Sequence, residues 1–179
     1  MKRLVAVFVT TMFFWFAPAA HAAVIPVEST PAELAPPAAV SQAVFPVPAK
    51  SGKGRRVVHS TRQLRVWVIN AQEEVLRTFL VSGQRGQPKK GTYTVSSQSV
   101  RSFSPALEGV TFRFMTRFAI GRNGGNIGFH EIPKRKGVPM QTVEELGTVR
   151  GSGCLRASTE DAKFIFSWAK PGTRIVVVP

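Results

Sequence analysis

The fold of this chain is constrained most by a series of short β-prone segments separated by turn-forming residues. Between Gln63 and Asn70, leucine or valine recurs at every second position, which predicts a strand with one buried face. A polar turn leads into a second strand, Glu74–Ser82, and the glycine-rich segment Gly83–Gly91 is expected to be a loop. The chain is therefore predicted to be mainly β, with further strands at Thr92–Ser96, Val110–Phe118, Ile127–His130 and Arg174–Val178.

One main helix is predicted near the C-terminus. Ser158 or Thr159 can cap its start, and Asp161 is placed to complete the cap. Four apolar side chains then fall on one face at i, i+3, i+4 and i+7, namely Ala162, Ile165, Phe166 and Ala169. Lys170–Gly172 contains a proline and is expected to end the helix.

The N-terminus has the pattern of an export signal over residues 1–22. Lys2 and Arg3 precede the apolar run Leu4–Phe16, and Ala20–Ala22 offers a small-x-small cleavage site. The apolar run is shorter than the roughly 20 residues of a spanning helix, so we expect cleavage after Ala22. The alternative is an uncleaved anchor, which would be the only membrane contact. The mature protein is thus expected in the periplasm or cell wall of a bacterium.

Residues 23–52 are expected to form a linker, and residues 53–179 one compact domain. Prolines recur through the linker and favour an extended, semi-rigid spacer. The domain is long enough for one hydrophobic core and too short for two.

The net charge of +14 at pH 7 indicates an anionic partner. No zinc-finger spacing, RNA-binding signature or basic run with interleaved aromatics is present, so nucleic acid is not expected as a partner. Anionic cell-wall polymers are compatible with both the charge and the export signal.

Cys154 is the only cysteine of the chain, so it cannot form an intramolecular disulfide. Gly151 and Gly153 leave its surroundings open to a substrate. Arg150 and Arg156 add positive charge, which is expected to favour the thiolate. Because structural cysteines of exported proteins usually come in pairs, this lone thiol indicates a nucleophile.

Histidine is the residue best suited to take the proton of such a thiol at neutral pH. His21 leaves with the signal, His59 lies at a strand entry, and His130 ends a strand after a glycine-rich turn. His130 is the better candidate for the base, the alternative being an ordinary half-buried strand-end histidine. One cysteine and two mature-chain histidines are a poor ligand set for a metal, so neither a metal nor another cofactor is expected.

The domain resembles the L,D-transpeptidase catalytic domain, the YkuD-type domain of bacterial cell-wall enzymes. The family motif is a histidine, a spacer, and then Ser/Thr-His-Gly-Cys followed by an aliphatic residue and Arg or Asn. It corresponds here to His130 and Gly151–Arg156. Further matches cover most of the domain: Thr61–Trp67, Val81–Gly83, Pro88–Tyr93, Met115–Phe118 and Gly172–Val177.

The resemblance implies a mixed β-sandwich or barrel-like domain and a cysteine acyltransferase. Cys154 would attack the carbonyl between the third residue of a peptidoglycan stem and the terminal D-alanine, and His130 would serve as general base. The acyl group would then pass to an amine of a neighbouring stem, giving a 3-3 cross-link. The N–H groups of Gly153 and Cys154 would form the oxyanion hole, and Ser152 and Arg156 would position the substrate. The thiol would also be expected to capture carbapenems.

Two other functions are compatible with the same residues. An L,D-carboxypeptidase or L,D-endopeptidase would use water in place of the amine acceptor. A catalytically silent wall-binding domain would suit the basic charge, although the intact Cys/His pair argues against it.

The sequence departs from the family pattern at three places. Ser152 stands where many members have histidine, which leaves His130 as the only imidazole assigned to Cys154. Glu131 replaces a glycine that often follows the motif histidine. The spacer Glu131–Arg150 is longer than the commonest one, and we expect it to form one wall of the substrate groove.

Overall fold

The computed structural model describes residues 45–179, so the predicted signal and most of the predicted linker lie outside the described residues. The first of its two sheets has the strand order β3-β2-β1-β11-β4. The bounds are β1 Arg56–Ser60, β2 Arg65–Ile69, β3 Val75–Leu80, β4 Gly91–Thr94 and β11 Arg174–Val178. β1 pairs in parallel with β11, and the other pairs are antiparallel.

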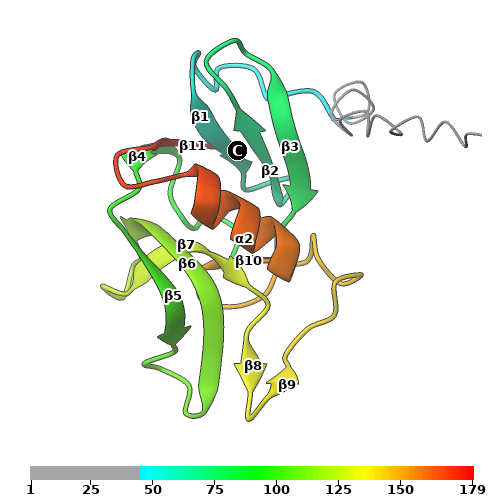
Figure 1. The fold of residues 1–179 in the computed structure, drawn as a ribbon, viewed down its shortest axis with the longest axis vertical. Helices are drawn as coiled ribbons and strands as arrows, with labels where there is room; N and C mark the ends of the chain where they lie inside the picture. The colour runs from blue at the N-terminus through cyan, green and yellow to red at the C-terminus, as the bar shows by residue number, and fades with distance from the viewer. Residues whose placement is uncertain (1–44) are drawn as a thin grey trace, which may run out of the picture. The chain divides into compact units, whose positions relative to one another are not determined.

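The second sheet has the order β10-β7-β6-β8-β9, with β5 also paired to β6. Its bounds are β5 Ser97–Phe103, β6 Val110–Ile120, β7 Asn126–Glu131, β8 Lys134–Arg135, β9 Val138–Pro139 and β10 Leu155–Ala157. β10 runs parallel to β7. In Figure 1 the hairpins β5–β6 and β8–β9 extend away from β1–β3, with the helix between them. The prediction of a mainly β domain with mixed sheets is confirmed.

Helix α2, Thr159–Trp168, joins the two sheets through a shared core. Ser158 caps it by accepting from the Asp161 N–H at 3.0 Å, as the sequence predicted. Ala162 and Ile165 are fully buried and pack with apolar side chains of both sheets. The helix therefore fixes β6, β7 and β10, which it contacts directly. No helix within residues 45–179 is long and apolar enough to cross a membrane.

The central strands β1 and β2 of the first sheet are buried on both faces. All five residues of β2 are buried, so the prediction of a strand with one buried face is wrong. Val66 and Val68 face the main core, whereas Trp67 belongs to a second apolar cluster on the other face. There the Trp67 Nε1–H donates to the carbonyl oxygen of Phe45 at 2.9 Å, and Val47 packs against the same cluster. The last residues of the predicted linker thus cover this face.

His59, on β1, is fully buried, and its Nε2 has no hydrogen-bond partner among the described residues. Burial lowers its pKa from 6.5 to about 4. Between these pH values the unfolded chain binds the extra proton, so the stability from this group is complete above pH 6.5 and falls as the pH drops toward 4. We expect His59→Leu to remove about 2 kcal/mol of this acid-induced loss between pH 7 and 4.5. Urea unfolding at both pH values measures it, and an equal loss in the variant and the wild type would contradict the assignment.

Candidate active site

Three strands of the second sheet place Cys154 in a row with a glycine and an arginine. Arg117 on β6 is paired with Gly128 on β7. Leu155, the first residue of β10, is paired with Phe129. The same parallel register places Cys154, the residue before Leu155, opposite Gly128. The three residues therefore lie across neighbouring strands on one face, with only the glycine between the arginine and the cysteine.

The next row along the same face contains His130. It is paired with Arg156 on β10, and the β6–β7 register places Met115 on its other side. Alternate residues of these strands, among them Phe129 and Leu155, point into the core. The sheet register therefore brings Cys154, His130 and Arg156 to one face from three separate parts of the sequence.

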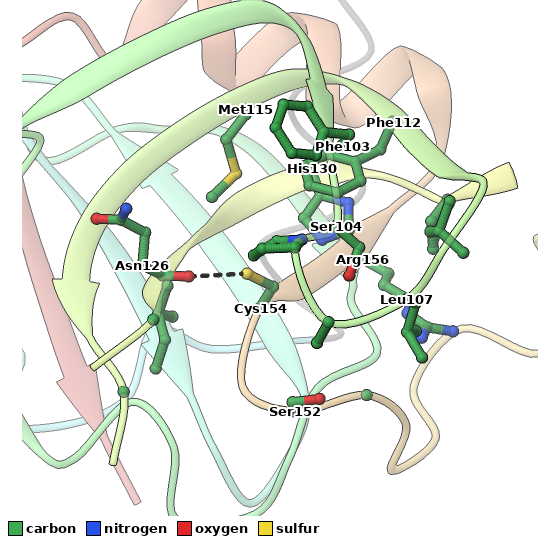
Figure 2. A pocket seen from close by; sticks show the side chains of 18 of the residues that line it. Phe103, Ser104, Leu107, Phe112, Met115, Asn126, His130, Ser152, Cys154 and Arg156 are labelled. Atoms are coloured by element: carbon green, nitrogen blue, oxygen red, sulfur yellow. Dashed lines mark hydrogen bonds between the residues drawn. The ribbon is translucent and has the colours of Figure 1, made fainter. Parts of the chain in front are cut away.

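These side chains line a cavity of about 540 Å³. Figure 2 shows Cys154, His130 and Arg156 around it, with aromatic side chains above them. Its apolar wall includes Phe103, Leu107, Phe112 and Met115, and its basic side chains are Arg117, Arg122 and Arg156. No aspartate or glutamate is among its described lining residues. The cavity thus combines apolar walls with positive charge.

The Cys154 thiol is half-buried and donates to the carbonyl oxygen of Asn126 at 3.3 Å (Figure 2). Burial raises its pKa above the ordinary value. A backbone hydrogen bond from Gly128 lowers the pKa, as do the charges of Arg117 and Arg156, without reversing the direction. The group is therefore a thiol at neutral pH and needs a base to become a nucleophile.

The prediction that the charge of Arg150 favours the thiolate of Cys154 is wrong. Its guanidinium forms an ion pair with Glu145 at 2.6 Å, and both side chains are 41% exposed. Arg117, which the sequence did not single out, acts on the thiol in its place.

His130 is held in one orientation. Its Nδ1 lies 2.6 Å from the carbonyl oxygen of Glu131, and its ring stacks on Phe112 with centroids 4.2 Å apart. Because a carbonyl oxygen only accepts, Nδ1 carries the proton and Nε2 is left free to take one. Burial, assisted by the charge of Arg156, lowers the pKa of His130 to about 4, so the ring is neutral at pH 7. This is the protonation state that a general base requires.

The Glu131 carboxylate anchors the backbone segment that holds His130. It is buried and accepts two hydrogen bonds from the Arg113 guanidinium, each of 2.9 Å, and a third of 2.9 Å from Thr159 at the start of α2. Burial alone would raise the pKa of Glu131, but Arg113 and Thr159 bring it below the usual value. The departure from the family pattern at this position thus ties the histidine to the helix.

The remaining predicted residues surround the thiol. Gly153 is buried with a φ of +137°, a conformation that favours glycine, and a side chain there would meet Ile127 at 3.0 Å. The N–H groups of Gly153 and Cys154 donate to no other group of residues 45–179. Ser152 is exposed at the cavity rim, and Arg156 lies half-buried beside Gly151.

Gln87 is a cavity residue that the sequence did not indicate. Its Nε2 donates to the carbonyl oxygen of Ser152 at 3.4 Å, and its Oε1 accepts from the Arg122 N–H at 3.0 Å. It therefore braces the segment before Cys154 against the turn before β7. Only the three-dimensional arrangement shows this role, because a glutamine in a polar loop carries no pattern of its own.

The long spacer 131–150 contributes less of the wall than predicted. Only Pro133 and Met140 of its interior line the cavity. Most of the apolar wall comes from the end of β5, the β5–β6 connection and β6, and Phe103 at the end of β5 is 72% exposed.

Gly128 is required by close packing. A Cβ at this position would lie 2.3 Å from the carbonyl oxygen of Thr116 on β6. Gly128→Ala must therefore push β6 and β7 apart, and we expect a loss of about 2–3 kcal/mol in the free energy of unfolding. Because Gly128 also lies beside Cys154, thiol alkylation should change as well. Urea unfolding and the rate of alkylation by iodoacetamide measure the two effects, and wild-type values of both would contradict this packing role.

Residues 54–177 match the family model of the YkuD L,D-transpeptidase catalytic domain. The chain belongs to this family. The fold agrees with solved L,D-transpeptidases, including those from Stackebrandtia nassauensis (17% identity, TM-score 0.57) and Xylanimonas cellulosilytica (18%, 0.56), and LdtMt1 in complex with imipenem (20%, 0.53). The alignments cover 73%, 76% and 71% of this chain, and 59%, 66% and 60% of those structures.

No curated protein matches the sequence significantly. The chain spans about half to two thirds of the length of the L,D-transpeptidase structures that it resembles. The structural similarity shows a common fold, and the match to the family model shows membership of the family. The L,D-transpeptidase family acts on peptidoglycan stem peptides.

Proposed function

We propose that the protein is a cysteine L,D-transpeptidase that forms 3-3 cross-links in peptidoglycan. The observation that carries this proposal is the pairing of a half-buried thiol with a neutral histidine in adjacent rows of one sheet face, inside one cavity. The Nδ1–H of His130 is committed to the Glu131 carbonyl oxygen, which leaves Nε2 as the proton acceptor.

In the acylation step, Cys154 attacks the carbonyl between the third stem residue and the terminal D-alanine. The thiol proton leaves its hydrogen bond to Asn126 and passes to Nε2 of His130, which gives it to the departing amine of D-alanine. A thioester to Cys154 remains. The N–H groups of Gly153 and Cys154, which have no other acceptor in residues 45–179, stabilise the oxyanion.

In the transfer step, the amine of a neighbouring third-position diamino acid attacks the thioester. His130 removes a proton from this amine, the new amide forms, and the thiol is restored. The absence of carboxylates from the described lining favours donors that carry negative charge. Arg156 and Ser152 contact the substrate at the rim, and no further cofactor enters these steps.

The reaction takes place outside the cytoplasm, in the periplasm or cell wall. The basic, apolar and small-residue segments of residues 1–22 support export, and the predicted linker would separate the domain from the membrane before cleavage. The mass of the mature protein from a cell-envelope fraction tests this: a chain beginning at Ala23 supports it, and an intact Met1 in the cytoplasm contradicts it.

A hydrolase using the same thioester is the second candidate. The β5–β6 connection leaves Phe103 and Leu107 exposed, so water has a path to the cavity. Incubation with purified tetrapeptide muropeptides, followed by mass spectrometry, separates the two functions. Dimers missing one D-alanine support transfer, and shortened monomers alone support an L,D-carboxypeptidase. Unchanged substrate with an alkylatable Cys154 would contradict both and favour a wall-binding domain.

A further inference from the structure

Arg117 presents an uncompensated positive charge to the cavity. Its Nη1 donates to Ser99 at 2.8 Å and its Nη2 to Ser102 at 3.3 Å, so two serines of β5 hold the guanidinium. No ion pair found within residues 45–179 includes Arg117, and no carboxylate lines the cavity there. A guanidinium has five N–H donors, so three remain for a ligand.

Arg117 on β6 and Cys154 before β10 line the same cavity, and Gly128 on β7 lies between them in the row. The backbones of Arg117 and Cys154 are two strand spacings apart, which is about 9–10 Å. Ser99 and Ser102 hold the guanidinium on the β5 side of this row, and its remaining donors are available to a group bound in the cavity that Cys154 also lines. Phe112 and Met115 make the adjoining wall apolar, so a charge bound there is poorly solvated and its interaction with Arg117 is strengthened.

We propose that Arg117 is a binding residue for a carboxylate carried by the donor peptide close to the carbonyl that Cys154 attacks. Successive Cα atoms are about 3.8 Å apart, so a carboxylate one residue from the attacked carbonyl can extend from Cys154 toward Arg117 within the cavity that both residues line. A guanidinium fork fits a carboxylate in both shape and charge. The proposal rests on the proposed function and names the donor feature that the enzyme selects.

Two carboxylates of a stem peptide have this chemistry. One is the C-terminal carboxylate of the leaving D-alanine, and the other is a side-chain carboxylate on the third-position diamino acid. The first would restrict donors to stems that end one residue after the attacked bond. The second would restrict them by the type of diamino acid.

A pair of thiol reagents tests the site without peptidoglycan. Bromoacetyl-D-alanine and bromoacetyl-D-alaninamide both alkylate a thiol with loss of bromide, and they differ in the charge of the terminal group. Both reagents react with the same thiolate, so the ratio of their rate constants does not depend on the fraction of Cys154 that is ionised. A hydrogen bond to a charged group changes binding by about tenfold or more, so we expect wild type to prefer the carboxylate by about that factor and Arg117→Met to show a ratio near one.

Arg101→Met is the matched control, because Arg101 is an exposed arginine of β5 outside the cavity lining, and its ratio should equal that of wild type. Arg117→Lys keeps the charge without the fork and should give an intermediate ratio. A wild-type ratio near one, or an unchanged ratio in Arg117→Met with a wild-type melting temperature, would overturn the proposal. Because no muropeptide is involved, these results are independent of whether the enzyme releases D-alanine.

Two amidated donors then identify the carboxylate. If Arg117 binds the leaving residue, a C-terminal amide should lower kcat/KM of wild type and leave Arg117→Met unaffected. If Arg117 binds the side-chain carboxylate of the third residue, amidation of that side chain should lower kcat/KM of wild type and leave Arg117→Met unaffected. Equal losses in wild type and Arg117→Met with both donors would exclude carboxylate binding by Arg117.

Discussion

Replacing Cys154 with serine is expected to abolish D-alanine release from tetrapeptide stems. Removal of a catalytic nucleophile lowers turnover by about four orders of magnitude or more. A serine hydroxyl is far less acidic than a thiol, and a neutral His130 whose pKa is about 4 is too weak a base to ionise it. Release of D-alanine from muropeptides, followed with time, measures this loss.

The fold of the Cys154→Ser variant should be intact. The two side chains are nearly isosteric, and a hydroxyl can still donate to the carbonyl oxygen of Asn126. A melting temperature close to that of wild type provides the control. Retained D-alanine release would remove Cys154 from the role of nucleophile.

His130→Gln should slow acylation by about two to four orders of magnitude, the range over which general bases contribute. The pH dependence is a second readout. His130 is neutral above about pH 4, so wild-type acylation should show no limb near pH 6.5 and should fall only as the pH approaches 4. At the alkaline end the raised pKa of Cys154 keeps the thiol protonated beyond its usual range. Single-turnover acylation measured from below pH 4 to above pH 9 covers both limbs.

His59→Leu is the control for this experiment. His59 is fully buried in β1 of the first sheet, outside the described cavity lining, so its replacement should leave acylation at pH 7 unchanged. If instead His130→Gln acylates at the wild-type rate, the proton acceptor must be another group, and the assignment of His130 fails.

Local patterns predicted the helix and most strands because those elements carry their own signals. Ser158 and Asp161 mark the start of α2, and alternating apolar residues mark β2 and β11. The strand β5 was missed because Ser97–Phe103 is largely polar and exposed, and it is stabilised by pairing with β6. Burial of β2 on both faces depends on the segment around Phe45, which no local pattern shows.

In the candidate site, too, some residues have a local sequence signal and others are recognised only from the fold. Cys154 and His130 could be identified from residue type and context, and the structure places both in one cavity. Arg117 and Gly128 could not, because their positions depend on the register of β6 against β7. The Glu131 anchor also required the fold, since its partners Arg113 and Thr159 lie on β6 and α2.

The most direct test of the proposed chemistry is the intact mass of the protein after mixing with a tetrapeptide donor and no amine acceptor. We expect an added mass equal to the donor minus D-alanine, localised to Cys154 by peptide mapping and removed by hydroxylamine, as a thioester is. The Cys154→Ser variant should show no such adduct on the same time scale. An adduct on any other residue, or D-alanine release without a covalent intermediate when the quench is faster than turnover, would contradict the account.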